Sequence, residues 1–211
     1  MHGGISSRRG QITLGDFDRC LPSLDRDERS VYNELVRRFL RPRLATFAGR
    51  GIVLGVGDDA EWRDVLPAAA DAKVVHATGD LGRELAEGTA DWVVLDRCLQ
   101  GLPEPTAALG EVVSRLKPGA ALMTLLTGIA RAESERHRPF WTVAPYAARR
   151  LHEEHRALEH VGVDQYGNVT LALAWLYRLP AEDLTERELA TTDPAYPVLV
   201  AVTGSKRGAS R

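Results

Sequence analysis

The stretch GIVLGVGDD, residues 51–59, decides what fold to expect. Residues 52–54 form a continuous apolar run, which is typical of a strand that is buried on both faces. Gly55 and Gly57 follow at once, and glycines permit the tight turn and the close backbone approach that a ligand at a sheet edge requires. Glycines equally suit an ordinary turn between a strand and a helix. The stretch therefore predicts either a ligand-binding turn or a plain one at the end of a central strand.

Two acidic residues at this turn limit the cofactors that it can bind. Asp58 and Asp59 stand where the GxGxxG motif of dinucleotide-binding proteins would continue towards its third glycine. Carboxylates at the start of a helix repel a pyrophosphate group, which disfavours NAD and FAD. A cofactor that lacks phosphate and carries positive charge suits this turn better.

Short apolar runs alternate with helical segments on the carboxyl side of the turn. Strands that are continuously apolar and separated by helices indicate a mostly parallel sheet covered on both faces. We therefore predict a doubly wound, Rossmann-like α/β fold, which binds ligands at the carboxyl ends of its strands. The predicted strands cover 51–57, 72–77, 91–96, 120–126, 158–164 and 196–204, and the predicted helices cover 60–66, 105–116, 144–155 and 168–179.

An amphipathic helix is predicted before the sheet, over residues 25–44. Apolar residues recur there at four-residue spacing and so share one face of a helix. Asp25 or Asp27 is expected to cap the start. Pro42 is expected to end or kink the helix, because proline lacks a backbone donor and its ring clashes with the preceding turn.

Composition and charge bound the remaining possibilities. The chain has 211 residues, of which 44% are hydrophobic and 27% charged, so we expect one packed domain. A formal net charge of −2 gives no general attraction for nucleic acid or for an anionic membrane. Cys20 and Cys98 lie far apart, which indicates neither a disulfide framework nor a zinc site. No apolar segment has the length of a signal peptide or a spanning helix, so we expect a cytoplasmic protein without stable membrane insertion.

Three segments after the turn resemble those of a known family. TGDL at 78–81, ADWVVLDRCLQGL at 90–102 and LKPG at 116–119 are similar in order to the motifs of class I S-adenosylmethionine-dependent methyltransferases. In that family a glycine turn follows the first strand, an acidic residue follows a later one, and LKPG precedes the fifth. The resemblance implies S-adenosylmethionine as cofactor, and its sulfonium charge and lack of phosphate agree with the acidic turn.

The resemblance extends to a bacterial subgroup associated with glycosyltransferases and surface-glycan synthesis. The similar segments are GDFDRCLPS at 15–23, FWTVAPYAARRL at 140–151 and VDQYGNV at 163–169. This subgroup implies a small molecule or a glycan as methyl acceptor, with transfer to an oxygen atom. The methyltransferase-like domain would then cover residues 25–206, between a flexible or lid-like segment at 1–24 and a tail at 207–211.

The resemblance implies that residues at the strand ends contact the cofactor. They are Gly55, Gly57 and Asp58 at the methionine and ribose end, Asp80 and Leu81 at the adenine, and Asp96 facing the sulfonium. The Asp80 carboxylate would accept a hydrogen bond from the adenine amino group, and Leu81 would pack on the ring. A plain turn residue is the alternative for Asp80, since aspartate favours turns.

Four further residues are candidates for substrate contact or catalysis. Arg97 follows Asp96 and would face the acceptor, and Phe140 and Trp141 would either wall a sugar or an apolar acceptor or belong to the core. His137 is a candidate general base, with an exposed loop histidine as the alternative. HEEH at 152–155 is not a zinc-binding motif, so no metal site is expected and a solvated helix face is the preferred interpretation.

One departure from the family pattern supports a second hypothesis. His76 or Thr78 stands where an acidic residue would normally hold the ribose hydroxyls, and the second and third strands are compressed into one. The alternative to an enzyme is therefore a degenerate, non-catalytic methyltransferase-like domain that serves as a binding partner or scaffold. The apolar segment at 168–179 is predicted to pack on the sheet or in a homodimer interface.

Overall fold

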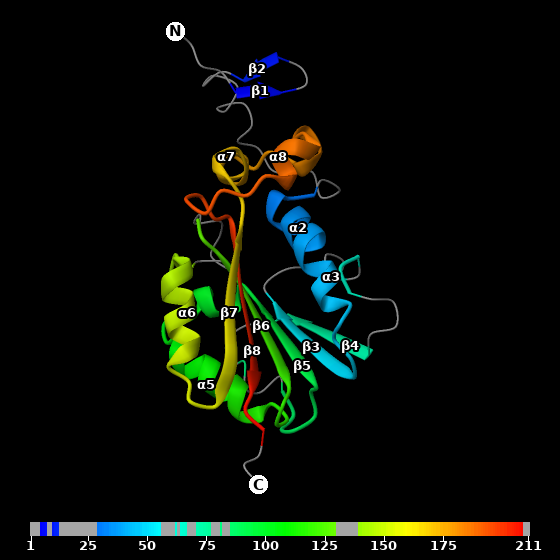
Figure 1. Ribbon diagram of the computed structural model, residues 1–211, viewed down its shortest axis with the longest axis vertical. Coiled ribbons are helices and arrows are strands. Elements are labelled where there is room, and N and C mark those ends of the chain that lie inside the picture. The colour runs from blue at the N-terminus through cyan, green and yellow to red at the C-terminus, as the bar shows by residue number, and fades with distance from the viewer. Residues whose placement is uncertain are drawn as a thin grey trace.

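The computed structural model describes residues 5–7, 10–12, 29–55, 62, 64–66, 71–76, 81, 85–129 and 139–208. The main element of this part of the chain is a six-stranded sheet with the order β4-β3-β5-β6-β8-β7 (Figure 1). Its strands are β3 (Arg50–Gly55), β4 (Asp71–His76), β5 (Trp92–Asp96), β6 (Ala121–Thr127), β7 (Leu158–Tyr166) and β8 (Leu199–Lys206). Each strand overlaps one that the sequence predicts, and the Rossmann-like α/β fold is confirmed.

The order of the strands determines where a ligand crevice can form. β3 pairs in parallel with both β4 and β5, β5 pairs in parallel with β6, and β8 runs antiparallel to β6 and β7. The chain passes from β3 outward to β4 and then returns to β5 on the other side of β3. In open α/β sheets, ligands bind outside the carboxyl ends of the strands at such a reversal. Gly55 and Asp96 end the two strands that meet there.

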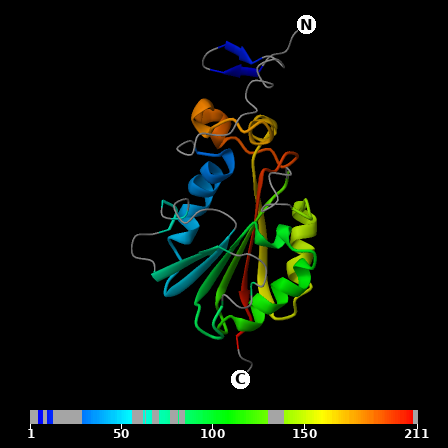
Figure 2. The same cartoon turned by 180° about the vertical axis from the view of Figure 1, so that it is seen from behind.

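Two apolar clusters lie on opposite faces of the sheet, because successive side chains of a strand point to opposite sides. In β3, Val53 belongs to one cluster, and Ile52 and Leu54 belong to the other. Helices α5 (Pro105–Arg115) and α6 (Pro145–Glu153) cover the face of Ile52 and Leu54, and the N-terminal helices cover the face of Val53 (Figures 1 and 2). The strands are therefore apolar on both sides, as the sequence pattern predicts.

The N-terminal helical segment consists of three short pieces in succession. They are α2 (Val31–Leu35), the π-helical η1 (Val36–Leu40) and α3 (Arg41–Leu44). The chain widens into the π turn directly before Pro42, whose ring cannot fit beside the carbonyl group four residues earlier in a regular α-helix. The predicted disturbance at Pro42 is thus present, as a local widening ahead of the proline.

The start of this helix differs from the prediction. Ser30 is the N-cap, and its Oγ accepts a hydrogen bond from the backbone N–H of Asn33 at 3.2 Å. The prediction that Asp25 or Asp27 caps the helix was wrong, since both precede its first turn. A serine hydroxyl serves as well as an aspartate carboxylate in this role.

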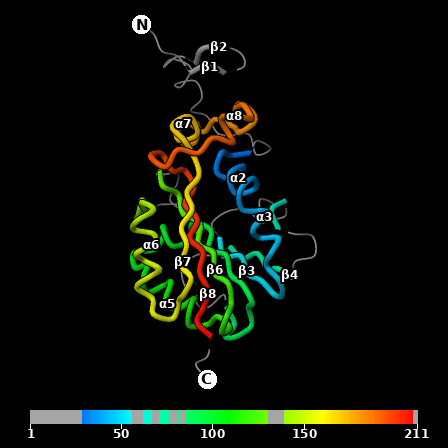
Figure 3. Tube along the Cα trace, viewed as in Figure 1, coloured from blue at the N-terminus to red at the C-terminus, as the bar shows by residue number. Residues whose placement is uncertain are grey.

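A second group of helices, between β7 and β8, lies over one end of the sheet and is called the helical cap below. It contains α7 (Val169–Leu176), the 3₁₀ turn η3 (Ala181–Asp183) and α8 (Glu186–Ala190). The N-terminal segment is attached to it, since Ala181 N donates to Arg29 O at 2.9 Å and Arg38 forms an ion pair with Glu186. Segments far apart in the sequence therefore lie side by side (Figure 3).

Asn168 holds the two α-helices of the cap together. Its Oδ1 accepts from Leu171 N at 3.0 Å and so caps α7. Its Nδ2 donates to Glu188 O and Thr191 O, each at 2.8 Å, at the end of α8. One side chain thus satisfies a backbone N–H at the start of α7 and two carbonyl groups at the end of α8.

We expect Asn168→Ala to lower the free energy of unfolding by about 2–3 kcal/mol, because a helix cap and two partly buried hydrogen bonds are lost. Urea denaturation followed by circular dichroism measures this change. Asn33→Ala is the matched control, since Asn33 lies within α2 and alanine is a good helix former, and its effect is expected to stay within about 0.5 kcal/mol. Equal midpoints for the two variants would contradict the role of Asn168.

Near the N-terminus, the structure also contains a short two-stranded ribbon. β1 (Ile5–Ser7) pairs antiparallel with β2 (Gly10–Ile12), where the sequence predicts no strand. The other residues of the segment 1–24 lie outside the described ranges, so its lid-like role stays a prediction. Within those ranges, no helix combines the length and the apolar character needed to cross a membrane.

Candidate functional site

Three residues end neighbouring strands at the point where the strand order reverses. The register pairs Gly55 of β3 with His76 of β4 on one side and with Asp96 of β5 on the other. A Cβ atom at position 55 would lie 3.3 Å from the Asp96 Cβ and 3.4 Å from its Oδ2. Gly55 therefore leaves the room that the Asp96 side chain needs, and the two residues predicted at this edge lie side by side.

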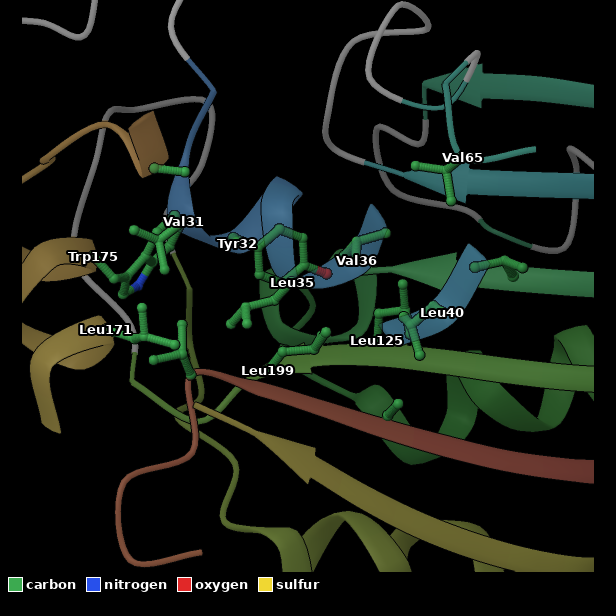
Figure 4. Packing of buried hydrophobic residues seen from close by; sticks show 14 of the residues in the cluster. Val31, Tyr32, Leu35, Val36, Leu40, Val65, Leu125, Leu171, Trp175 and Leu199 are labelled. Atoms are coloured by element: carbon green, nitrogen blue, oxygen red, sulfur yellow. The ribbon is translucent and has the colours of Figure 1, made fainter. Parts of the chain in front are cut away.

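The Asp96 carboxylate is buried, with 1% of the residue exposed, and it accepts hydrogen bonds from three side chains. Tyr32 Oη donates to Oδ1 at 2.6 Å, Trp62 Nε1 donates to Oδ2 at 3.3 Å, and Arg97 Nε donates to Oδ1 at 3.2 Å. A buried carboxylate requires such partners, because desolvation of an unpaired charge costs several kcal/mol. Tyr32 projects from α2 within the apolar cluster that also contains Leu35 (Figure 4).

Arg97 holds an unusual conformation directly after Asp96. Its φ is +58°, in the left-handed region that few residues other than glycine adopt. Its backbone N–H donates to Leu125 O at 2.9 Å, and its guanidinium carbon lies 4.4 Å from the centroid of the Tyr32 ring. The guanidinium thus pairs with the Asp96 carboxylate and stacks over an aromatic face, and both contacts suit a cation.

A small hollow adjoins this cluster between α2 and the segment after β3. The described side chains that line it are Tyr32 and Asn33 from α2, Val36 from η1, Trp62 and Val65 from the segment after β3, and Asp96 from β5. Among the described residues that line it, Asp96 carries the one charged group. The hollow therefore combines aromatic walls with a carboxylate at the carboxyl end of a central strand.

Gln100 connects the end of β5 with the segment that precedes α6. It lies in the 3₁₀ turn η2 (Cys98–Gly101) and is buried. Its Oε1 accepts from Thr127 N at 2.7 Å, and its Nε2 donates to Trp141 O at 3.0 Å. Its own carbonyl oxygen accepts from Phe140 N at 2.7 Å. Gln100 thus fixes the two predicted aromatic residues next to the end of β6.

Phe140 and Trp141 are surface residues, with 63% and 47% of their area exposed, and not core residues. The Trp141 indole N–H donates to Leu102 O at 2.8 Å, so its polar edge is already satisfied. Tyr146, at the start of α6, is also exposed. Exposed rings held by backbone hydrogen bonds can offer their faces to a ligand.

Leu81, predicted to pack on an adenine ring, is buried in the apolar cluster that contains Leu54 and Leu85. Its side chain therefore belongs to the protein interior. The other predicted site residues lie outside the described ranges, and their roles stay predictions. They are Gly57, Asp58 and Asp80 for the cofactor and His137 for the general base.

The interpretation of HEEH as a solvated helix face was wrong for its first residue. His152 is buried, with its Nδ1 at 2.8 Å from Ala148 O and its Nε2 at 2.8 Å from the Thr124 hydroxyl of β6. A carbonyl only accepts, so Nδ1 carries the proton and the threonine hydroxyl donates to Nε2. Burial lowers the pKa of His152 from 6.5 to about 4. The residue ties α6 to the sheet.

Sequence reasoning missed three residues of this region, namely Tyr32, Trp62 and Gln100. Tyr32 lies in a predicted helix, and its contact with Asp96 joins positions 64 residues apart. Trp62 follows the glycine turn, where an aromatic residue directly after an acidic stretch was a usable signal. Gln100 belongs to the block that carries the family resemblance, but its role emerges only when the end of β6 is placed beside it.

Comparison with solved structures places this arrangement among known folds. A S-adenosylmethionine-dependent methyltransferase of Thermotoga maritima, described as a possible histamine N-methyltransferase, superposes with a TM-score of 0.54 at 16% identity, covering 84% of this chain and 90% of its own. A putative methyltransferase of Haloferax volcanii in complex with its Trm112 activator gives 0.53 at 14% identity, with coverages of 85% and 92%.

A third structure, a S-adenosylmethionine-dependent methyltransferase of Archaeoglobus fulgidus, gives a TM-score of 0.52 at 13% identity and covers 82% of this chain and 94% of its own. The chain has the class I methyltransferase fold. No sequence-family model matches the chain, and no curated protein matches it either. The class I methyltransferase fold that the sequence motifs imply is thus confirmed. Sequence identities this low support a conclusion about the fold alone.

Proposed function

We propose that the protein is a S-adenosylmethionine-dependent methyltransferase that acts on a small molecule or a glycan, with an oxygen atom as methyl acceptor. The observation that carries the proposal is the arrangement at the strand reversal, where Gly55 adjoins a buried carboxylate on Asp96. A methyltransferase needs little beyond a cofactor held at this edge and an acceptor held in line with it. The acceptor class rests on the similarity to the bacterial subgroup.

The residues at the strand ends fit this cofactor in charge and in space. Because Gly55 has no side chain, the backbone of β3 can approach a ligand closely. Asp96 adds negative charge near the place of a sulfonium, and no basic pyrophosphate site is needed. S-adenosylmethionine supplies an electrophilic methyl group when bound. The chain would hold its ribose end near Gly55 and the exposed His76, whose imidazole can form a single hydrogen bond to a hydroxyl.

The acceptor side is formed by groups that follow β5 and β6. Arg97 lies beside Asp96, and Gln100 anchors the backbone of Phe140 and Trp141. Two exposed aromatic rings in a fixed position suit the flat faces of a sugar ring. We assign Phe140 and Trp141 to the acceptor and His137, which precedes this pair in the sequence, to the proton transfer.

Two observations favour a second candidate function, a non-catalytic binding or scaffold domain. The Asp96 carboxylate already receives donors from Tyr32, Trp62 and Arg97. His76 or Thr78 stands where an acidic group would hold two ribose hydroxyls, and loss of such an acceptor weakens binding by about 1–3 kcal/mol. A domain that keeps the fold without the cofactor would show these same features.

Calorimetric titration with S-adenosylhomocysteine, the product of methyl transfer, separates the two functions. For the enzyme we expect a dissociation constant in the micromolar range, roughly −8 kcal/mol. His76→Ala is expected to weaken binding about fivefold, since one hydrogen bond to the ligand is lost at an exposed position. Gly101→Ala, at a position with open space around it, is the control with unchanged affinity.

An absence of heat at millimolar ligand, from a sample with a cooperative unfolding transition, would support the scaffold and contradict the enzyme. If His76→Ala binds S-adenosylhomocysteine with the affinity of the wild type, the ribose lies elsewhere. In that case the assignment of the cofactor is kept, and the role of His76 in ribose binding is refuted.

A further inference from the structure

The buried side-chain amide of Gln100 uses its whole hydrogen-bonding capacity inside the protein. Its Oε1 accepts from Thr127 N at 2.7 Å and from the Thr127 hydroxyl at 3.1 Å. Its Nε2 donates to Thr127 O and to Trp141 O, each at 3.0 Å. A carboxamide has two N–H donors and two lone pairs on its oxygen, so each of these positions is engaged. The amide therefore serves to hold two chain segments together.

Trp141 is attached to η2 and the residue that follows it by its main chain and by its ring. Phe140 N donates to Gln100 O at 2.7 Å, and the Gln100 amide donates to Trp141 O. The indole N–H of Trp141 donates to Leu102 O at 2.8 Å. Since the ring is about half exposed, packing restrains it less than these hydrogen bonds do. The position of the indole therefore follows that of η2.

The turn η2 begins directly at the edge where the cofactor is proposed to bind. Asp96 ends β5 at the strand reversal, Arg97 follows it, and η2 starts at the next residue. Gln100 N donates to Arg97 O and Leu102 N donates to Leu99 O, each at 3.3 Å, so backbone hydrogen bonds close the turn. A closed turn of this length moves as a unit. A ligand that shifts the backbone at residues 96–97 would therefore also shift the indole.

Strand β6 is the fixed support of this connection. Arg97 N donates to Leu125 O at 2.9 Å, and the Gln100 amide binds the backbone of Thr127 two residues further along. Leu125 is buried in the sheet. Loss of the amide would leave the bond between Phe140 N and Gln100 O in place, but it would detach Trp141 O from η2 and η2 from the end of β6. The side chain of Gln100 thus joins the two ends of the connection.

We propose that Gln100 is a positioning residue that couples the cofactor edge to the acceptor wall, so that a ligand bound beside Asp96 sets the position of Trp141. This coupling rests on the proposed methyltransferase function and adds an order of binding to it. Because linkage between two binding sites is reciprocal, an acceptor held by Trp141 binds more tightly once the cofactor is in place. Gln100 acts through η2 and contacts neither ligand.

The test follows the indole N–H signal of Trp141 in a nitrogen-15 correlation spectrum during titration with S-adenosylhomocysteine. The signal is assigned with Trp141→Phe, and it reports on η2 because the indole donates to Leu102 O. In the wild type we expect a saturable shift whose midpoint equals the dissociation constant from calorimetry. The indole of Trp92, at the opposite end of β5 from Asp96, is the internal control.

Gln100→Glu keeps the size of the side chain and makes the connection depend on pH. An ionised carboxylate would oppose Thr127 O and Trp141 O, whereas a protonated one donates to a carbonyl group again. Burial and the facing carbonyl oxygens raise the pKa of the introduced carboxyl group. We therefore expect a shift near that of the wild type at about pH 5.5 and a loss of more than about half of it at about pH 8.5.

Three comparisons separate coupling from a general effect on the structure. The shift in the wild type is expected to be the same at both pH values, since an amide does not titrate. Affinity of Gln100→Glu for S-adenosylhomocysteine is expected to stay within about twofold of the wild type, because the side chain and the ligand share no contact. Gly101→Ala, in the same turn and with open space around it, is expected to keep the full shift.

Gln100→Met serves if Gln100→Glu does not fold, because methionine has a similar length without the polar atoms, and its shift is expected to be lost at both pH values. A Trp141 signal that the bound ligand leaves unmoved in the wild type would overturn the coupling. So would a full shift in the Gln100 variants at the higher pH, or an equal loss in Gly101→Ala. Absence of calorimetric heat in the wild type would overturn the methyltransferase function and the coupling together, whereas normal binding with any of the other three results overturns the coupling alone.

Discussion

Gly51→Ala is expected to lower the free energy of unfolding by on the order of 3–4 kcal/mol, because the added methyl group would occupy the space of a buried indole. A Cβ at position 51 would lie 1.9 Å from two ring atoms of Trp92, its partner on β5. Trp92 is 2% exposed and packs against Phe47, with ring centroids 5.5 Å apart, so the ring has little room to move. The change removes a large part of the stability of an ordinary domain.

Urea denaturation of the wild type, Gly51→Ala and Gly101→Ala measures this effect. The Gly101 variant is the control, since a Cβ there meets nothing within 4 Å. In a Trp92→Leu background the same Gly51→Ala change is expected to cost much less, because the smaller side chain leaves room for the methyl group. A loss below about 1 kcal/mol in the wild-type background would show that the ring relocates freely.

The second large effect is acid destabilisation through His152. The pKa of the buried imidazole is lowered to about 4, against 6.5 for an exposed histidine. Its contribution to stability is therefore complete above pH 6.5 and is lost as the pH falls from 6.5 to about 4, where the folded state also takes up the proton. Since one pKa unit corresponds to about 1.4 kcal/mol, the loss amounts to about 3 kcal/mol.

Unfolding free energies, measured by urea denaturation between pH 7.5 and pH 4, test this expectation. Because other carboxylates and histidines also titrate in this range, the wild type is compared with a variant that lacks the imidazole. His152→Gln cannot take up the proton, so the wild type should lose about 3 kcal/mol more than this variant over the range. His160→Asn is the matched control, because His160 is exposed and asparagine tolerates its positive φ of 55°. Parallel curves for the wild type and His152→Gln would refute the role of the buried imidazole.

The strands were predictable because most of them are buried on both faces. β3 and β5 are almost wholly buried along their length, and their sequences are accordingly continuous apolar runs. Helix α8 was not predicted, although Thr185 and Glu188 form a capping box that marks its start. The ribbon of β1 and β2 was missed as well, because ISS and GQI contain too few apolar residues to stand out as strands.

The candidate site was predictable where its residues follow strands in the sequence. Gly55 and Asp96 were placed together because parallel strands end at one edge. The role of Tyr32 was not predictable, since it depends on how α2 crosses that edge, which no local pattern specifies. The contact of Arg97 with the Tyr32 ring likewise depends on a left-handed backbone conformation, and arginine gives no sign of one in the sequence.

The attachment of the N-terminal helices to the helical cap has a consequence for biosynthesis. Arg29 and Arg38 are translated early, but their partners Ala181 and Glu186 emerge from the ribosome only after most of the chain. β8 is made later still, although it lies between β6 and β7. During synthesis α2 therefore lacks part of its apolar partners until α7 and β8 are made, and a nascent chain arrested before Lys206 would be a natural client for chaperones.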